Sequence, residues 1–148
     1  MNATPGYTIC EVGWTEGRAS LAAVRVKVFV EEQHVPEDEE WDAEDLHSRH
    51  VVAVTADGIP IGTGRLLRDG HIGRMAVLKE WRGKGVGRAL MQALLWLAHE
   101  TGHRAVRLHA QTHATGFYER QGFVAAGEVF MEAGIPHVMM SRDLGIRD

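Results

Sequence analysis

A glycine-rich segment at residues 82–88 has the residue types and the spacing that bind a negatively charged group. It contains three glycines and three basic residues, in the order Arg82, Gly83, Lys84, Gly85, Val86, Gly87 and Arg88. Residues 89–97, rich in alanine and leucine, follow as a predicted helix. The first N–H groups of a helix lack intrahelical acceptors, and the positive end of the helix dipole lies at the same place. The segment therefore predicts an anion cradle, which we interpret as a pyrophosphate site.

The spacing of the glycines distinguishes between classes of pyrophosphate site. A dinucleotide-binding fingerprint needs Gly-x-Gly-x-x-Gly, but Arg88 stands where the third glycine would be. A P-loop needs serine or threonine after its lysine, and Lys84 is followed by Gly85. A dinucleotide-dependent oxidoreductase is therefore disfavoured. A glycine-softened loop before a core helix, without any ligand, remains an alternative.

Length and composition are those of one globular domain that covers residues 1–148. The chain is 45% hydrophobic and 24% charged. Its net charge of −4 gives no reason to expect nucleic acid as a partner. Cys10 is the single cysteine, which excludes an internal disulfide and leaves no thiol pair for a metal, so we expect none. Without a signal-peptide pattern or an apolar stretch of about 20 residues, we expect a cytoplasmic protein that does not enter a membrane.

Hydrophobic periodicity predicts strands and helices around the glycine-rich segment. Strands are expected at 7–12, 49–55, 61–67, 72–78, 105–110, 124–130 and 138–142. Helices are expected at 21–30, starting near Ser20, at 89–97 and, as a short element, at 112–122. The step from Val77 to Ala105 crosses a helix, which is the pattern of a βαβ crossover between parallel strands. The sequence therefore predicts an α/β fold.

An acidic segment at residues 37–45 has a role that the sequence leaves open. Its acidic residues are Glu37, Asp38, Glu39, Glu40, Asp42, Glu44 and Asp45, interrupted by Trp41. A solvated loop is one interpretation, and an electrostatic attractor for a cationic amine is another. A metal site is less favoured, because no oxygen-ligand loop pattern such as the EF-hand is present.

Two motifs in the chain resemble those of the GNAT superfamily of N-acetyltransferases. The first is Arg-x-x-Gly-x-Gly, at Arg82, Gly85 and Gly87, after a strand that ends in Ala-Val. The second is the segment 114–123, which contains Phe-Tyr-Glu-Arg around Tyr118 and ends in Gly-Phe. The two motifs occur in the order and at the distance that the superfamily shows.

Further segments are similar to the ElaA-like branch of that superfamily, namely 28–33, 109–111 and 130–137. The resemblance implies a single-domain GNAT fold, with a mixed central sheet of about six to seven strands and helices on both faces. It implies acetyl-coenzyme A as cosubstrate and direct acetyl transfer to a primary amine of a small molecule or peptide. A coenzyme A-binding sensor or interaction module without catalysis is the alternative. The acceptor and a homodimer remain open.

The same resemblance implies which residues contact the cofactor. They are Met75, Ala76, Val77, Arg82, Gly83, Lys84, Gly85, Val86, Gly87, Arg88, Gln111 and Tyr118. A kink in the strand at 75–77 would free a backbone N–H for the thioester carbonyl and open a slot beside the strand. Gln111 stands where many relatives have asparagine, so the amide is kept but lengthened.

Catalytic roles also follow from the resemblance. Tyr118 is expected to protonate the leaving thiolate. His71 stands where some relatives have a catalytic glutamate, and histidine titrates in a useful range for a base. Glu132 or His137, and deprotonation through water, are the other candidates. The expected substrate-binding residues are Glu32, Gln33, His109, Glu132 and His137.

Overall fold

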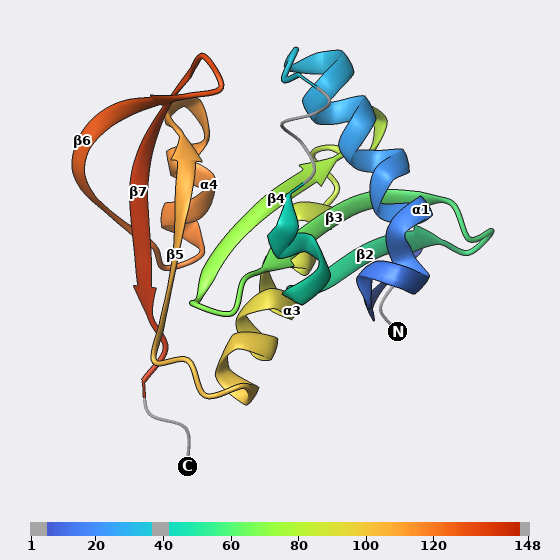
Figure 1. Ribbon diagram of the computed structural model, residues 1–148, viewed down its shortest axis with the longest axis horizontal. Coiled ribbons are helices and arrows are strands. Elements are labelled where there is room, and N and C mark those ends of the chain that lie inside the picture. Colours follow the sequence, from blue (N-terminus) through green and yellow to red (C-terminus); the bar gives the residue numbers. More distant parts are fainter. Residues whose placement is uncertain (1–5, 37–41, 146–148) are drawn as a thin grey trace.

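Seven strands form one mixed sheet in the structure, a computed structural model that describes residues 6–36 and 42–145 (Figure 1). They are β1 Tyr7–Val12, β2 Arg49–Thr55, β3 Pro60–Leu66, β4 His71–Val77, β5 Ala105–Gln111, β6 Val124–Glu132 and β7 Ile135–Asp143. Their order is β1-β2-β3-β4-β5-β7-β6, and each neighbouring pair is antiparallel except β4 and β5. The predicted mixed sheet and its parallel crossover are confirmed.

The helices pack around the central strands. They are α1 Trp14–Arg25, the π-helix η1 Val26–Glu32, the short 3₁₀ turns η2 Ala43–His47, η3 Lys79–Trp81 and η4 Thr112–Ala114, and the helices α3 Val86–Glu100 and α4 Thr115–Arg120. In Figure 1, α1 lies in front of strands β2 to β4 and α3 lies behind them. The sheet therefore has helices on both faces, as predicted.

Helix α1 begins earlier than the sequence predicted. It starts at Trp14, directly after Gly13, and not near Ser20. Gly17 explains how the first turns fit, because a Cβ at this position would lie 2.5 Å from a methyl carbon of Val12. The glycine lowers helix propensity but allows the helix to pack against the end of β1.

One face of α1 and of the π-helix η1 that continues it is buried. Leu21, Val24 and Val28, which recur at helical spacing, are at most 3% exposed, and Phe29 is partly buried against the core.

Two glycines of β3 allow helix α3 to lie close to the sheet. A Cβ at Gly62 would lie 2.9 Å from the side chain of Leu90, and one at Gly64 would lie 2.7 Å from that of Leu94. Both leucines are fully buried on the inner face of α3. Because side chains alternate along a strand, the neighbouring Arg65 points to the opposite face, toward α1. These glycines therefore have a packing role.

The β6–β7 hairpin differs from its predicted form. Ala133 and Gly134 have φ angles of 53° and 76°, as a two-residue hairpin turn requires at both central positions. The strands therefore continue to Glu132 and resume at Ile135. Glu132 and His137, which the sequence placed on a final loop, lie instead within paired strands.

Candidate active site

The parallel strands β4 and β5 pair only at the first two residues of β4 and then separate. In the described residues, the register joins His71 to Arg107 and Ile72 to Leu108 and extends no further. The strands diverge beyond this point (Figure 1), and a cavity of about 580 Å³ lies there. Side chains from η1, β3, β4, β5, α4, β6 and β7 line this cavity. A pocket of this size suits a small ligand or an extended arm of a larger one.

A β-bulge in β4 accompanies the separation. The register with β3 places the single residue Gly64 opposite two residues of β4, Arg74 and Met75. Arg74 has a φ of 50°, in the left-handed region that costs energy for a residue with a side chain. The Thr63 hydroxyl donates a hydrogen bond of 3.0 Å to the Arg74 carbonyl, which helps to hold this conformation. The kink predicted near residues 75–77 is therefore confirmed, beginning at Arg74.

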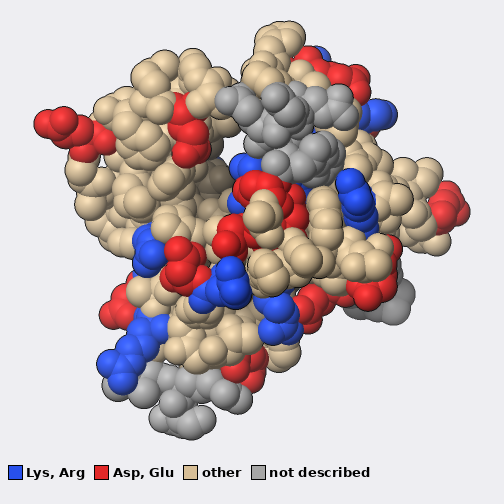
Figure 2. Space-filling view, viewed as in Figure 1, with Lys and Arg blue, Asp and Glu red and all other residues tan. Residues whose placement is uncertain are grey.

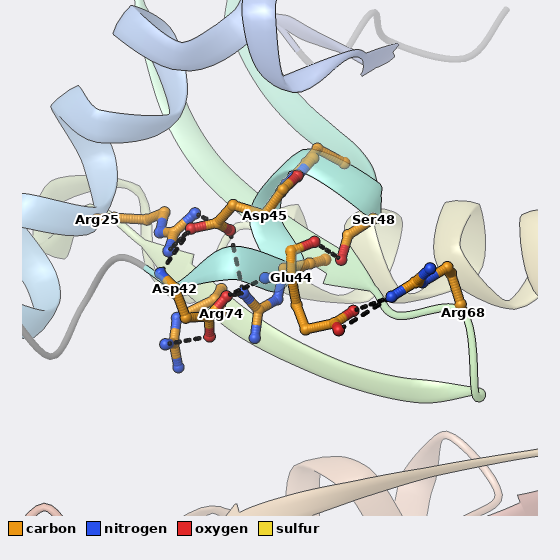
Figure 3. A network of polar contacts seen from close by, with 9 residues as sticks. Arg25, Asp42, Glu44, Asp45, Ser48, Arg68 and Arg74 are labelled. Atoms are coloured by element: carbon orange, nitrogen blue, oxygen red, sulfur yellow. Dashed lines mark hydrogen bonds and ion pairs between the residues drawn. The ribbon is translucent and has the colours of Figure 1, made fainter.

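A buried ion-pair network supports the bulge from the side of α1 (Figure 3). Arg25 donates two hydrogen bonds to Asp45, at 3.0 and 3.2 Å, and Arg65 donates one to Asp45 at 3.0 Å. Asp42 joins the network by accepting from Arg65 at 2.8 Å and from Arg74 at 3.2 Å. Burial alone raises the pKa of Asp45, but the two arginines outweigh it and leave that pKa below its usual value. The network therefore links α1, η2, β3 and the strained residue of β4.

These contacts bear on the acidic segment. The carboxylates of Asp42, Glu44 and Asp45 are all paired with arginines, in the case of Glu44 with Arg68 at 3.1 Å. Internal pairing reduces what these residues contribute to an attraction of external cations, and Asp45 is too buried to be a solvated loop residue. Residues 37–41 lie outside the described residues.

The glycine-rich segment forms an open backbone loop at the start of α3. Gly83 and Gly85 have φ angles of 76° and 84°, and the N-cap residue Gly85 has no side chain to cap the first N–H groups of the helix. Gly87 follows in the first turn, where a Cβ would lie 3.4 Å from the ring of Phe117 in α4. Lys84 lies over the ring of Trp81, 5.7 Å from its centroid. This geometry leaves uncovered N–H groups that can donate hydrogen bonds to an anion.

Arg82 makes contacts that the sequence did not predict. Its guanidinium forms two hydrogen bonds of 2.8 Å with the carboxylate of Glu32, and its Nε donates to the Val77 carbonyl at 2.9 Å. The hydrogen bond from Arg82 lowers the pKa of Glu32 and outweighs partial burial, with help from the charges of Arg82 and Lys79. In this conformation the charge of Arg82 is paired, and the residue ties η1 to the end of β4.

Gln111 is held from the same part of the chain. Its amide nitrogen donates to the amide oxygen of Gln33 at 2.9 Å, and both side chains line the cavity. Since Glu32 binds Arg82 beyond β4 and Gln33 binds the end of β5, the end of η1 connects to both sides of the opening.

Tyr118 lies in α4 and lines the same cavity. Its ring packs edge-on against Phe117 and Phe123, with centroids 5.1 and 6.1 Å away. Burial raises the pKa of Tyr118 to about 12. The phenol therefore keeps its proton at neutral pH.

Four of the predicted acid–base and substrate-binding residues come together on the wall of the cavity. His71, His109, Glu132 and His137 all line it. Glu132 lies 2.8 Å from Nδ1 of His109 and 3.6 Å from Nε2 of His137, and the rings of His71 and His109 meet edge-on at 5.5 Å. The structure thus brings together residues that are far apart in the sequence.

Sequence reasoning missed two residues that hold His71. Asp69 contacts Nδ1 of the ring at 3.1 Å, and Arg107 donates from Nε to the ring Nε2 at 3.3 Å. Burial raises the pKa of Asp69, but hydrogen bonds from His71 and the charges of His71 and Arg107 outweigh it and lower that pKa. The position of Asp69, two residues before His71 in the sequence, was the available signal.

The described residues also bear on three other features, namely surface charge, metal binding and membrane crossing. On the face shown in Figure 2, acidic and basic side chains are intermixed. Among residues 6–36 and 42–145, no group of three or more His, Cys, Asp or Glu side chains is placed to hold a metal ion. None of the described helices has the length and apolar composition that a membrane crossing needs.

The fold and the cleft define a class of protein. A mixed sheet whose parallel strands separate at a bulge, beside a helix with a glycine-rich start, is the arrangement that the two sequence motifs led us to expect of an N-acetyltransferase of the GNAT superfamily.

Comparison with known proteins agrees with this class. Residues 17–144 match the acetyltransferase (GNAT) domain. An uncharacterized N-acetyltransferase of Bacillus subtilis, YjcF, is 41% identical over 124 residues, which are 81% of this chain and 88% of YjcF. The crystal structure of Escherichia coli ElaA superposes with a TM-score of 0.82 at 31% identity and covers 92% of this chain and 99% of ElaA. An acyl-CoA N-acyltransferase from Pseudomonas aeruginosa gives 0.81 at 34% identity, with the same two coverages.

The chain belongs to the GNAT acetyltransferase family. It is an acetyltransferase, and the family uses acyl-coenzyme A as donor.

Proposed function

We propose that the protein transfers an acetyl group from acetyl-coenzyme A directly to a primary amine of a small molecule or peptide. The observation that carries this proposal is the separation of β4 from β5 at the bulge, with Tyr118 lining the cavity between them. The open start of α3 lies against the same short helix as Tyr118, because Gly87 faces the ring of Phe117. These features fit a linear thioester that carries a pyrophosphate.

The chain offers suitable groups along the length of such a cosubstrate. The uncovered N–H groups of residues 83–88 would hold the pyrophosphate, with side-chain charge from Lys84 and Arg88. The backbone of residues 75–77, beyond the last rung with β5, would bond the pantetheine arm and the thioester carbonyl. The Gln111 amide would contact the arm after exchange of its bond to Gln33. Arg82 would act through its tie to Glu32 and not as a free charge.

Tyr118 is assigned as the general acid. Acetyl transfer forms a C–N bond and breaks a C–S bond, so the departing sulfur needs a proton. Tyr118 lines the cavity, and burial raises its pKa, so the phenol is protonated at neutral pH.

The acceptor amine would enter from the side of the histidines. We propose that the amine is bound by four residues that line the cavity, Gln33, His109, Glu132 and His137. Glu32, the remaining predicted substrate-binding residue, is half-exposed and paired with Arg82, so we propose that it acts by positioning that arginine.

A turnover screen tests the proposal. The purified chain would be incubated with acetyl-coenzyme A and polyamines, amino sugars, amino acids and peptides with free N-termini, with thiol release and product mass recorded. We expect at least one amine to gain the mass of an acetyl group with equal release of thiol. Tight coenzyme A binding without any acetylated product would favour a non-catalytic binding module.

A further inference from the structure

His109 and Glu132 form a hydrogen-bonded pair on the wall of the cavity, where both side chains are open to solvent. His109 lies near the end of β5, and Glu132 is the last residue of β6. The ring Nδ1 and the carboxylate Oε1 are 2.8 Å apart. An ionised carboxylate can only accept, so Nδ1 carries the hydrogen and donates it. In the neutral ring, Nε2 then keeps its lone pair, which is the state a base requires.

The surroundings fix both members of the pair. The His109 ring meets Phe130 edge-on at 5.0 Å and His71 edge-on at 5.5 Å. The second oxygen of Glu132 lies 3.6 Å from Nε2 of His137, and Nδ1 of His137 donates to the Ile135 carbonyl at 2.7 Å. Glu132 is therefore contacted on both oxygens, and the orientation of His109 depends on it.

His71, the histidine that the sequence favoured as a base, has a different environment. Its Nδ1 faces Asp69 at 3.1 Å, so this nitrogen donates. Its Nε2 accepts a hydrogen bond from Nε of Arg107 at 3.3 Å. The lone pair of neutral His71 is thus occupied, whereas no described residue is recorded as a partner of Nε2 of His109.

We propose that His109 is the general base of the acetyl transfer and that Glu132 is the positioning residue that holds its tautomer. This inference rests on the proposed function. Nε2 of His109 takes the proton from the amine nitrogen as the C–N bond forms, Tyr118 gives a proton to sulfur as the C–S bond breaks, and exchange with water restores both groups. Glu132 stabilises the positive charge that His109 acquires.

Five variants test the roles with the panel amine that the parent acetylates fastest. We expect His109→Gln to lower kcat about 10²-fold or more, and Glu132→Gln to lower it about tenfold, at an unchanged KM for acetyl-coenzyme A. Imidazole added to His109→Ala should restore part of the rate. His47→Gln, the same change at an exposed histidine of η2, should match the parent. A larger loss in His71→Gln than in His109→Gln would overturn the assignment.

A second measurement is independent of the acceptor. Nitrogen-15 NMR of the imidazole rings in the parent should show His109 with its hydrogen on Nδ1, and His109→Gln identifies the signals. Glu132→Gln should change that tautomer balance, which a purely structural role of Glu132 would leave unmoved. A hydrogen on Nε2 in the parent would overturn the pair. If the parent acetylates no amine, the proposed function fails, while this spectrum still tests the hydrogen bond between His109 and Glu132. If the parent is active and His109→Gln has the same kcat, only the assignment of His109 as the base fails.

Discussion

Replacing Tyr118 by phenylalanine separates its catalytic role from its packing role. The ring would keep its edge-on contacts with Phe117 and Phe123, at 5.1 and 6.1 Å. Within residues 6–36 and 42–145 no hydrogen bond is recorded for the Tyr118 hydroxyl, so its removal leaves no buried partner unsatisfied. The free energy of unfolding should therefore change by less than about 0.5 kcal/mol, which for a chain of this size is a shift of about 2 °C or less in Tm.

The effect on turnover should be much larger. A positioned acid contributes about 10²-fold or more to the rate, and a 10²-fold loss corresponds to about 2.7 kcal/mol in activation free energy. Because the proton is needed only as the C–S bond breaks, kcat should fall while KM for acetyl-coenzyme A stays the same. The assay follows thiol release at saturating acetyl-coenzyme A, under conditions where the chemical step limits the rate.

The opposite result is equally clear. If Tyr118→Phe turns over as fast as the parent under those conditions, Tyr118 is a packing residue of α4, and the proton on sulfur comes from water or from another side chain such as His113. A fall in kcat together with a fall of many degrees in Tm would instead show that the hydroxyl has a structural partner.

Three further predictions concern the cradle, the ion-pair network and pH. Gly87→Glu places a negative charge at the start of α3 and should raise the dissociation constant for coenzyme A, measured by calorimetry, tenfold or more, about 1.4 kcal/mol. Trp96→Glu places the same charge on an exposed position of that helix and should leave the dissociation constant unchanged. Asp45→Asn removes the negative charge that the buried side chains of Arg25 and Arg65 share, and it should cost about 3–5 kcal/mol of unfolding free energy in urea titrations. Arg68→Gln, at an exposed pair, should cost less than about 1 kcal/mol. Equal costs would contradict the role of the network. Burial lowers the pKa of His50 in spite of its hydrogen bond to the Asp45 carbonyl. As the pH falls below about 6.5, the unfolded chain therefore takes up a proton before the folded chain does, and the free energy of unfolding should decline. Between pH 8 and pH 5 the urea midpoint should fall less steeply in His50→Gln than in the parent, and an identical slope would refute this.

Local patterns in the sequence predicted the parts of the site that local chemistry determines. The glycines of residues 82–88 and the start of α3 follow from backbone conformation and helix ends, which short-range spacing specifies. The buried stripe of Leu21, Val24 and Val28 follows from helical periodicity. The start of α1 at Trp14 was not predicted, because a glycine such as Gly17 disfavours a helix interior. The close approach of Val12, which requires a glycine at this position, is known only from the structure.

Contacts between distant residues could not be predicted in this way. Arg82 and Glu32 are 50 positions apart, and Gln111 and Gln33 are 78 positions apart. The pairing of His109 with Glu132 requires β7 to lie between β5 and β6 and the hairpin to turn at Ala133 and Gly134, which is information about sheet order. The family resemblance favoured His71, because it stands where some relatives have a catalytic glutamate, but a resemblance carries no signal of Arg107 on its ring.

The central claim is that an acetyl group leaves a thioester held between β4 and β5 and arrives on an amine. Acetyl-coenzyme A with a deuterated acetyl group, incubated with the chain and the amine panel, tests it most directly by mass spectrometry. We expect an amide that carries all three deuterium atoms, with one free thiol for each amide formed. Bound acetyl-coenzyme A that stays intact with every amine, or thiol release with label only in acetate, would contradict it.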